Sequence, residues 1–154
     1  MKQVCCFGNS LHGDDGIGLA VYEHLHQKGY KSNVHYFADV PINALNLLTE
    51  SNSVILVDAI AVSEYQGEVL ELTIDELKSH QTDIGSSAHL NSISYLLNAL
   101  ENTVNFMPKI KIYGVGINNI DRYHIGLSDE AEKAVIHLSR MIETELEAEH
   151  SLEQ

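Results

Sequence analysis

The sequence predicts an α/β protein with three layers (α/β/α), in which helices cover both faces of a mostly parallel, twisted sheet. Two observations support this prediction. Short apolar runs alternate along the chain with amphipathic segments of ten or more residues, and such alternation is typical of right-handed crossover units around a parallel sheet. In addition, residues 53–60 form a nearly continuous apolar run, which is typical of a central strand that is buried on both faces.

The first part of the chain predicts strands and helices in strict alternation. The expected strands are residues 3–7, 34–38 and 53–60, and the expected helices are residues 16–28 and 41–50. The first helix has apolar residues at helical spacing and is followed by Gly29, a typical C-terminal cap. The second helix has Pro41 in its first turn, where proline is tolerated.

The second part of the chain continues the pattern. Residues 67–72 alternate well enough for a further strand, at an antiparallel edge of the sheet. The remaining expected elements are a short helix at 74–78, a polar loop at 81–87, a helix at 89–101, a last strand at 109–115 and a long helix at 128–148. Ser128 is the expected N-cap of that long helix, and the acidic residues after it complement the helix dipole.

Length and charge limit the classes of protein to consider. The chain has 154 residues, which suits a single domain over residues 1–154. It carries 9 basic and 22 acidic side chains, a formal net charge of -13. This charge repels phosphate backbones and anionic lipids, so we expect neither nucleic-acid binding nor membrane association.

The cellular location is predicted from apolar runs and cysteines. No apolar run reaches the roughly 20 residues that span a bilayer, and the N-terminus lacks the apolar run of a signal peptide. Cys5 and Cys6 are adjacent in an expected strand, where a bridge between them would be badly strained, and we expect both to pack in the core. We therefore expect a cytoplasmic protein, and a monomer because no apolar pattern marks a dimer face.

The first predicted loop, residues 8–18, is rich in glycine and lies between a strand and a helix. Such a turn suggests a phosphate cradle, but the glycine spacing matches neither the dinucleotide fingerprint nor the P-loop. Asp14 and Asp15 would also repel a phosphate at this position. They are candidates for cation binding, with helix capping as the structural alternative. The roles of Asp14 and His12 stay open.

Two further residues follow predicted strands or begin predicted helices. Asp58 closes the most apolar strand, where burial disfavours a charged carboxylate unless a cation or a polar partner compensates. The structural alternative is an aspartate that binds the amides of the next loop. His89 stands in the first turn of a helix, where the dipole favours the neutral imidazole that acts as a base or a metal ligand.

These candidates come from three different strand-to-helix junctions. Active sites of open α/β sheets lie beyond the carboxyl ends of the strands, so we expect Asp15, Asp58 and His89 to meet there. Two carboxylates and one imidazole can bind a borderline divalent ion with coordination positions left open. The residues therefore indicate a cation site, although no two of them form a local metal motif.

Three motifs in this order resemble the hydrogenase maturation proteases. They are Gly-Asn-x-Leu-x-Gly-Asp-Asp-Gly-x-Gly at residues 8–18, Val-Asp-Ala at residues 57–59 and Ser-x-His at residues 87–89. Gly-Val-Gly at residues 114–116 and Gly-Leu-Ser at residues 126–128 also look like that family. Many relatives have Gln and Pro after the Gly-Val, whereas this chain has Gly116-Ile117-Asn118, a difference that bears on which precursor is recognised.

The resemblance implies a cytoplasmic endopeptidase that removes the C-terminal extension of a nickel-iron hydrogenase large-subunit precursor after nickel insertion. Asp15, Asp58 and His89 match the family's nickel-contacting and catalytic positions. The nickel arrives with the precursor, and no tightly held metal of the protease's own is expected. Two alternatives remain: a metal-dependent hydrolase that carries its own ion at the same site, and a non-catalytic nickel-handling chaperone.

Overall fold

The computed structural model describes residues 1–79, 88–118 and 123–153. In these segments five strands form one sheet in the order β2-β1-β3-β5-β4. The strands are β1 (Gln3–Cys6), β2 (Val34–Tyr36), β3 (Ser53–Ala61), β4 (Val69–Leu72) and β5 (Lys109–Ile117). All neighbours pair in parallel except β4, which runs antiparallel to β5. The predicted parallel sheet with an antiparallel edge strand is confirmed.

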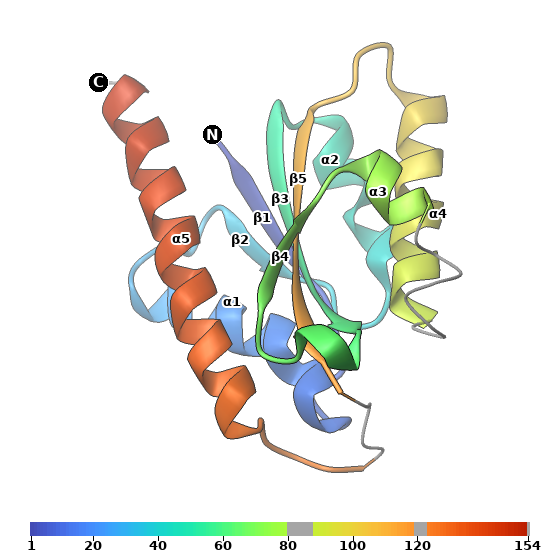
Figure 1. The fold of residues 1–154 in the computed structure, drawn as a ribbon. Helices are drawn as coiled ribbons and strands as arrows, with labels where there is room; N and C mark the ends of the chain where they lie inside the picture. The colour runs from blue at the N-terminus through green and yellow to red at the C-terminus, as the bar shows by residue number, and fades with distance from the viewer. Residues whose placement is uncertain (80–87, 119–122, 154) are drawn as a thin grey trace.

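Helices connect the strands and cover the sheet on both sides. The α-helices are α1 (Ile17–Gln27), α2 (Leu45–Thr49), α3 (Ile74–Ser79), α4 (Ala88–Thr103) and α5 (Asp129–Glu153). Three short 3-10 helices are η1 (Gly13–Gly16), η2 (Pro41–Ala44) and η3 (Ser63–Tyr65). Figure 1 shows α1 and α5 on one side of the sheet and α2, α3 and α4 on the other, which confirms the three-layer prediction.

The central strand β3 is apolar on both faces because each face packs against helices. Ile55 and Val57 belong to the core cluster on the side of α1 and α5, whereas Val54 and Leu56 belong to the cluster on the side of α4. Successive side chains of a strand point to opposite faces. The continuous apolar run therefore arises from two hydrophobic cores that share one strand.

Some boundaries differ from the predicted ones. The expected helix at 41–50 is divided, with one 3-10 turn (η2) before the short α2. The expected helix at 16–28 likewise begins as 3-10 (η1) and becomes α-helical at Ile17. Both 3-10 turns directly follow loops at the carboxyl edge of the sheet. The predicted loop at 81–87 lies outside the described residues.

Among the helices that the structure describes, none has both the length and the apolar composition needed to cross a bilayer.

Candidate functional site

The first loop turns sharply at Gly8, and this turn brings the backbone of Asp15 close to the carboxylate of Asp58. Gly8 has φ 132°, a conformation that side chains rarely adopt. A Cβ atom at this position would lie 2.2 Å from the carbonyl oxygen of Asp15 and 3.7 Å from Oδ1 of Asp58. Glycine is therefore required here, because the backbone of η1 and the side chain from β3 both approach the same point.

Asp15 lies in η1 and is 1% exposed. Its Oδ2 accepts a hydrogen bond of 2.9 Å from the backbone N–H of Asn9. The backbone N–H of Asp15 itself donates to the carbonyl of His12 at 3.1 Å. The loop thus holds this carboxylate in one orientation beneath the surface.

Asp58 lies within β3 rather than at its end, which corrects the sequence-based placement. The strand continues to Ala61, and Asp58 pairs with Gly114 of β5. On the other side of β3, β1 has already ended at Cys6, the partner of Val57. The shorter neighbour leaves Asp58 beside the first loop, so the residue reaches the site although it is not terminal.

The carboxylate of Asp58 is 2% exposed. Its Oδ1 accepts a hydrogen bond of 2.8 Å from the N–H of Ala59. This bond is the amide contact that the structural alternative predicted, and it orients one oxygen. The hydrogen bond from Ala59 does not explain why the Asp58 side chain lies close to the backbone of Asp15. That position follows from the turn of the first loop at Gly8.

The hydroxyl group of Tyr36 lies in the negative electrostatic field of several carboxylates. Its hydroxyl donates to the carbonyl of Gly8 at 2.6 Å. Burial raises the pKa of Tyr36, and the negative charges of Asp15, Asp39 and Asp58 raise it further. Three carboxylates from three different loops and strands therefore lie near this one hydroxyl group.

Asp39 is a further candidate residue that the sequence patterns did not select. It lies in the loop that follows β2, three positions after Tyr36, so it satisfies the same rule of position that selected the other candidates. The preceding Ala38 has φ 53°, which is uncommon for a residue with a side chain, and its carbonyl accepts the N–H of Gly8 at 2.7 Å. Such strained backbone is frequent at functional sites.

Asp14, whose role the sequence leaves open, has a different partner from Asp15. Its Oδ1 and Oδ2 accept hydrogen bonds from the N–H and Oγ–H of Ser128, each 2.7 Å long. Ser128 in turn accepts from the N–H of Ala131 at 3.2 Å, as the predicted N-cap of α5. Asp14 therefore fastens the start of α5 to the first loop.

His89 is the second residue of α4, and its side chain lies outside the described part of the structure. Ser92, one helical turn later, lines the same pocket as Asp39. The first turns of α4 thus lie beside the carboxyl end of β2. The meeting of the imidazole with the two carboxylates stays a prediction.

Among the described side chains, no three from His, Cys, Asp or Glu lie close enough to hold a metal ion.

Cys6 is fully buried, and burial, the charge of Cys5 and the charge of Asp58 raise the pKa of its thiol well above the usual range. Burial likewise raises the pKa of Cys5 to about 12. The expectation that both cysteines pack in the core is confirmed.

Comparisons with known proteins show the family to which the chain belongs. A sequence profile of the hydrogenase maturation protease family matches residues 19–145. The match includes Asp58 and His89 and begins after Asp15. No curated protein matches the chain. Because the profile covers most of the sequence, the chain belongs to the hydrogenase maturation protease family and is a peptidase. This result favours an enzyme over the non-catalytic nickel-handling chaperone.

Solved structures with the same fold include three proteases. The hydrogenase maturating endopeptidase HybD of Escherichia coli superposes with a TM-score of 0.78 at 22% identity, over 96% of this chain and 93% of that one. The [NiFe] hydrogenase maturation protease HybD of Thermococcus kodakarensis gives 0.75 at 26%, over 93% and 97%. The endopeptidase HycI of Escherichia coli gives 0.71 at 19%, over 91% and 87%.

Proposed function

We propose that this peptidase removes the C-terminal extension of a nickel-iron hydrogenase large-subunit precursor after nickel has been inserted, and that it recognises the nickel in that precursor. The observation that carries the proposal is the pair of buried carboxylates. Asp15 and Asp58 are 1% and 2% exposed, and the backbone carbonyl of Asp15 and the Oδ1 atom of Asp58 both approach Gly8. A cation carried by the substrate would compensate such buried carboxylates at this edge of the sheet.

The chemistry of the pair suits a metal that the substrate brings. Buried negative charges are costly unless they are compensated, and a divalent cation compensates two at once. Two carboxylates and the His89 imidazole supply few ligands, so they complete a coordination sphere that the precursor already fills in part. The nickel ion as a Lewis acid, or one carboxylate as a general base, activates the attacking water.

The wider proposal concerns the setting of the reaction. The precursor is the protein partner, and the enzyme acts as a monomer in the cytoplasm. The charge of -13 keeps nucleic acids and anionic surfaces away. The same charge favours the approach of a partner whose exposed segment carries a metal cation or basic side chains.

The decisive experiment is cleavage of the precursor, with and without nickel, by the protein and its variants. We expect Asp15→Asn, Asp58→Asn and His89→Ala each to lower the cleavage rate by more than about 100-fold, beyond the usual cost of losing an outer partner of a metal site. Asp75→Asn, an exposed aspartate at the start of α3, is the matched control. Wild-type rates in all three site variants would refute the assignment of the site.

Metal analysis of the dialysed protein tests the origin of the nickel. We expect less than stoichiometric metal in the absence of precursor and full cleavage of nickel-loaded precursor by this metal-depleted enzyme. A tightly held ion at one per chain, lost together with activity, would instead support a hydrolase that carries its own metal.

A further inference from the structure

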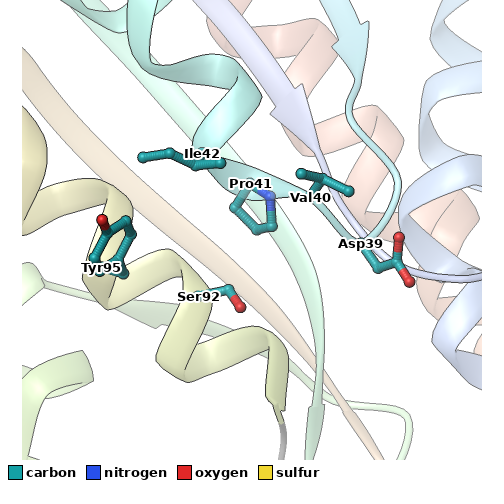
Figure 2. Close-up of a pocket in the computed structure, with 6 residues that line it drawn as sticks. All are labelled: Asp39, Val40, Pro41, Ile42, Ser92 and Tyr95. Carbon is teal, nitrogen blue, oxygen red and sulfur yellow. The ribbon is translucent and has the colours of Figure 1, made fainter.

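The sheet has a cavity at each of its two edges. The pocket of Figure 2 lies at the carboxyl edge, where Asp39 and Ser92 are among its lining residues. The other cavity has a volume of about 170 Å³ and is lined by Lys2, residues 53–55 and residues 109–111. These residues begin β1, β3 and β5 or directly precede them, so this cavity lies at the amino edge, which is the upper edge of the sheet in Figure 1. Along β3 it is about 17 Å from Asp58.

Lysine side chains are concentrated at this amino-edge cavity. Three of the 9 basic residues of the chain line it, namely Lys2, Lys109 and Lys111. Among the described residues that line it, none is Asp or Glu. In a chain with a formal net charge of -13, such a lining is the reverse of the average surface. The cavity therefore favours an anion, whereas the carboxylate site at the other edge favours a cation.

The register of the strands places two of these lysines on either side of Ser53. Lys109 of β5 pairs with Ser53 of β3. On the other side of β3, Gln3 is the partner of Val54, so Lys2 is level with Ser53. Neighbouring strands are about 4.8 Å apart, and the Cα atoms of the two lysines are therefore about 10 Å from each other. Each flexible four-carbon side chain can cross half of that distance, so both ammonium groups can reach one ligand.

The same three residues point to one face of the sheet. Val4 and Ile55 belong to the core cluster on the side of α1 and α5. Side chains alternate between the two faces along a strand, so Lys2 and Ser53, two positions earlier, point to that side as well. Lys109 does too, because it is in register with Ser53. Two ammonium groups and one hydroxyl group are thus placed around a common point.

The lysines differ in their acidic partners. Lys111 pairs with Glu145 of α5 and with Glu71 of β4, the latter at 3.8 Å. Within the part of the chain that the structure describes, no ion pair joins the side chain of Lys2 or Lys109 to a carboxylate. Like charges this close repel each other, and a bound anion would remove the repulsion. Lys2 and Lys109 are therefore the side chains that can hold a ligand.

The size and the lining of the cavity limit the class of anion. Pockets for drug-sized ligands are typically about 300–1,000 Å³, so a nucleotide would not fit in this cavity. Among the described lining residues none is aromatic, and a base would have no ring to stack on. Lysine binds phosphate groups as a point charge, and the hydroxyl group of Ser53 is a further donor.

We propose that the amino-edge cavity binds a small divalent oxyanion of the phosphate class between Lys2 and Lys109. Such a ligand would connect the beginnings of three neighbouring strands and stabilise the folded protein. The structural alternative is that the lysines only balance the acidic end of α5, where Glu149 accepts the backbone N–H of Lys2 at 2.6 Å. The proposal does not depend on the proposed cleavage, since it concerns the opposite edge of the sheet.

The test is isothermal titration calorimetry with inorganic phosphate at constant ionic strength. We expect one phosphate per chain, with a Kd about 2- to 5-fold higher in Lys2→Gln and in Lys109→Gln, the usual effect of losing an exposed charge pair. The double variant should show about a 5- to 25-fold higher Kd. Lys133→Gln is the matched control, because Lys133 is an exposed lysine of α5 about 18 Å along the helix from Glu145. It should keep the wild-type Kd.

The calorimetry has two results that would overturn the proposal. One is the absence of phosphate binding to the wild-type protein. The other is an equal Kd in the wild-type protein and the double variant. A poly-glutamate peptide is titrated in parallel. Binding of that peptide without binding of phosphate would show a surface for an acidic protein segment, and would also overturn the proposal.

Thermal unfolding separates specific binding from screening and from a structural role of the lysines. We expect phosphate to raise the Tm of the wild-type protein and of Lys133→Gln more than sodium chloride does at the same ionic strength, and to lose this extra effect in the double variant. Equal effects of the two salts on the wild-type protein would overturn the proposal. So would a double variant that has a lower Tm than the wild-type protein without phosphate, if phosphate changes neither Tm. No precursor is used in these measurements, so their failure leaves the proposed function intact.

Discussion

Asp14 and Asp15 are adjacent in the sequence, but their carboxylates have different partners, so the same substitution should give opposite results. Asp14 accepts two hydrogen bonds from Ser128, each 2.7 Å long. The carboxylate of Asp15 accepts from the N–H of Asn9, and the backbone carbonyl of Asp15 approaches Gly8 together with Oδ1 of Asp58. We predict that Asp14→Asn keeps cleavage near the wild-type rate, whereas Asp15→Asn abolishes it.

The magnitude for Asp14 follows from the bonds that are lost. Hydrogen bonds to a charged acceptor contribute about 1.5–3 kcal/mol each. Because Asp14 is partly exposed, water compensates some of that loss, and Asp14→Ala should lower the free energy of unfolding by about 2–3 kcal/mol. For a chain of this size that corresponds to a fall in Tm of about 4–12 °C.

Asparagine at this position can keep both contacts. Its amide oxygen can accept the N–H of Ser128, and its amide nitrogen can donate to the Ser128 hydroxyl. We therefore expect Asp14→Asn to cost less than about 1 kcal/mol, the value of an ordinary neutral hydrogen bond. The difference between the alanine and asparagine variants separates the loss of the bonds from the loss of the charge.

The assay is urea unfolding of Asp14→Ala, Asp14→Asn, Ser128→Ala and the double variant Asp14→Ala/Ser128→Ala, with precursor cleavage measured on each folded protein. Since the two side chains share their contacts, the double variant should be less destabilised than the sum of the single ones by about 1–2 kcal/mol. If the two single losses of unfolding free energy add up fully in the double variant, the proposed interaction between Asp14 and Ser128 is refuted. Loss of cleavage in a stable Asp14→Asn variant would show that Asp14 contacts the substrate.

Two predictions concern ionisable groups inside the protein. Cys5 and Cys6 are fully buried and burial raises the pKa of both thiols, so a thiol reagent at pH 8 should react with them only at the rate of unfolding; rapid labelling of folded protein would contradict this. For Tyr113, burial, its hydrogen bond to Glu145 and the charge of that carboxylate raise the pKa from 10.0 to about 12. Because the pKa is higher in the folded than in the unfolded protein, Tyr113 contributes its full stabilisation below pH 10. That stabilisation is lost as the pH rises through about 12. The free energy of unfolding should therefore fall between these pH values, and Tyr113→Phe should flatten that fall, whereas equal slopes in both proteins would refute the explanation.

Much of the fold could be predicted because it depends on local patterns. The apolar run of β3, the alternation of strands with helices and the cap at Ser128 are each readable from neighbouring residues. The divided helix at η2 and α2 was not predictable in the same way. Its 3-10 start follows a loop whose course depends on contacts with distant parts of the chain.

The candidate site depends on residues that the sequence singles out and on a geometry that it does not contain. The position rule selected Asp15 and Asp58, and in the structure the backbone of Asp15 and the side chain of Asp58 both lie close to Gly8, since the carboxyl ends of parallel strands share one edge. The same rule would have selected Asp39, but its surroundings (a single aspartate before Val-Pro) carry no distinctive motif.

The sequence by itself determined the order of the elements, the parallel sheet and the family motifs, because hydrophobic periodicity and loop chemistry are encoded within a few residues of one another. The tertiary structure alone decided which partners the carboxylates meet. Asp14 binds Ser128, 114 positions away. Asp58 reaches the loop because β1 ends before β3 does. Partners so distant along the chain meet only when the sheet is assembled, and local sequence patterns hold no record of that distance.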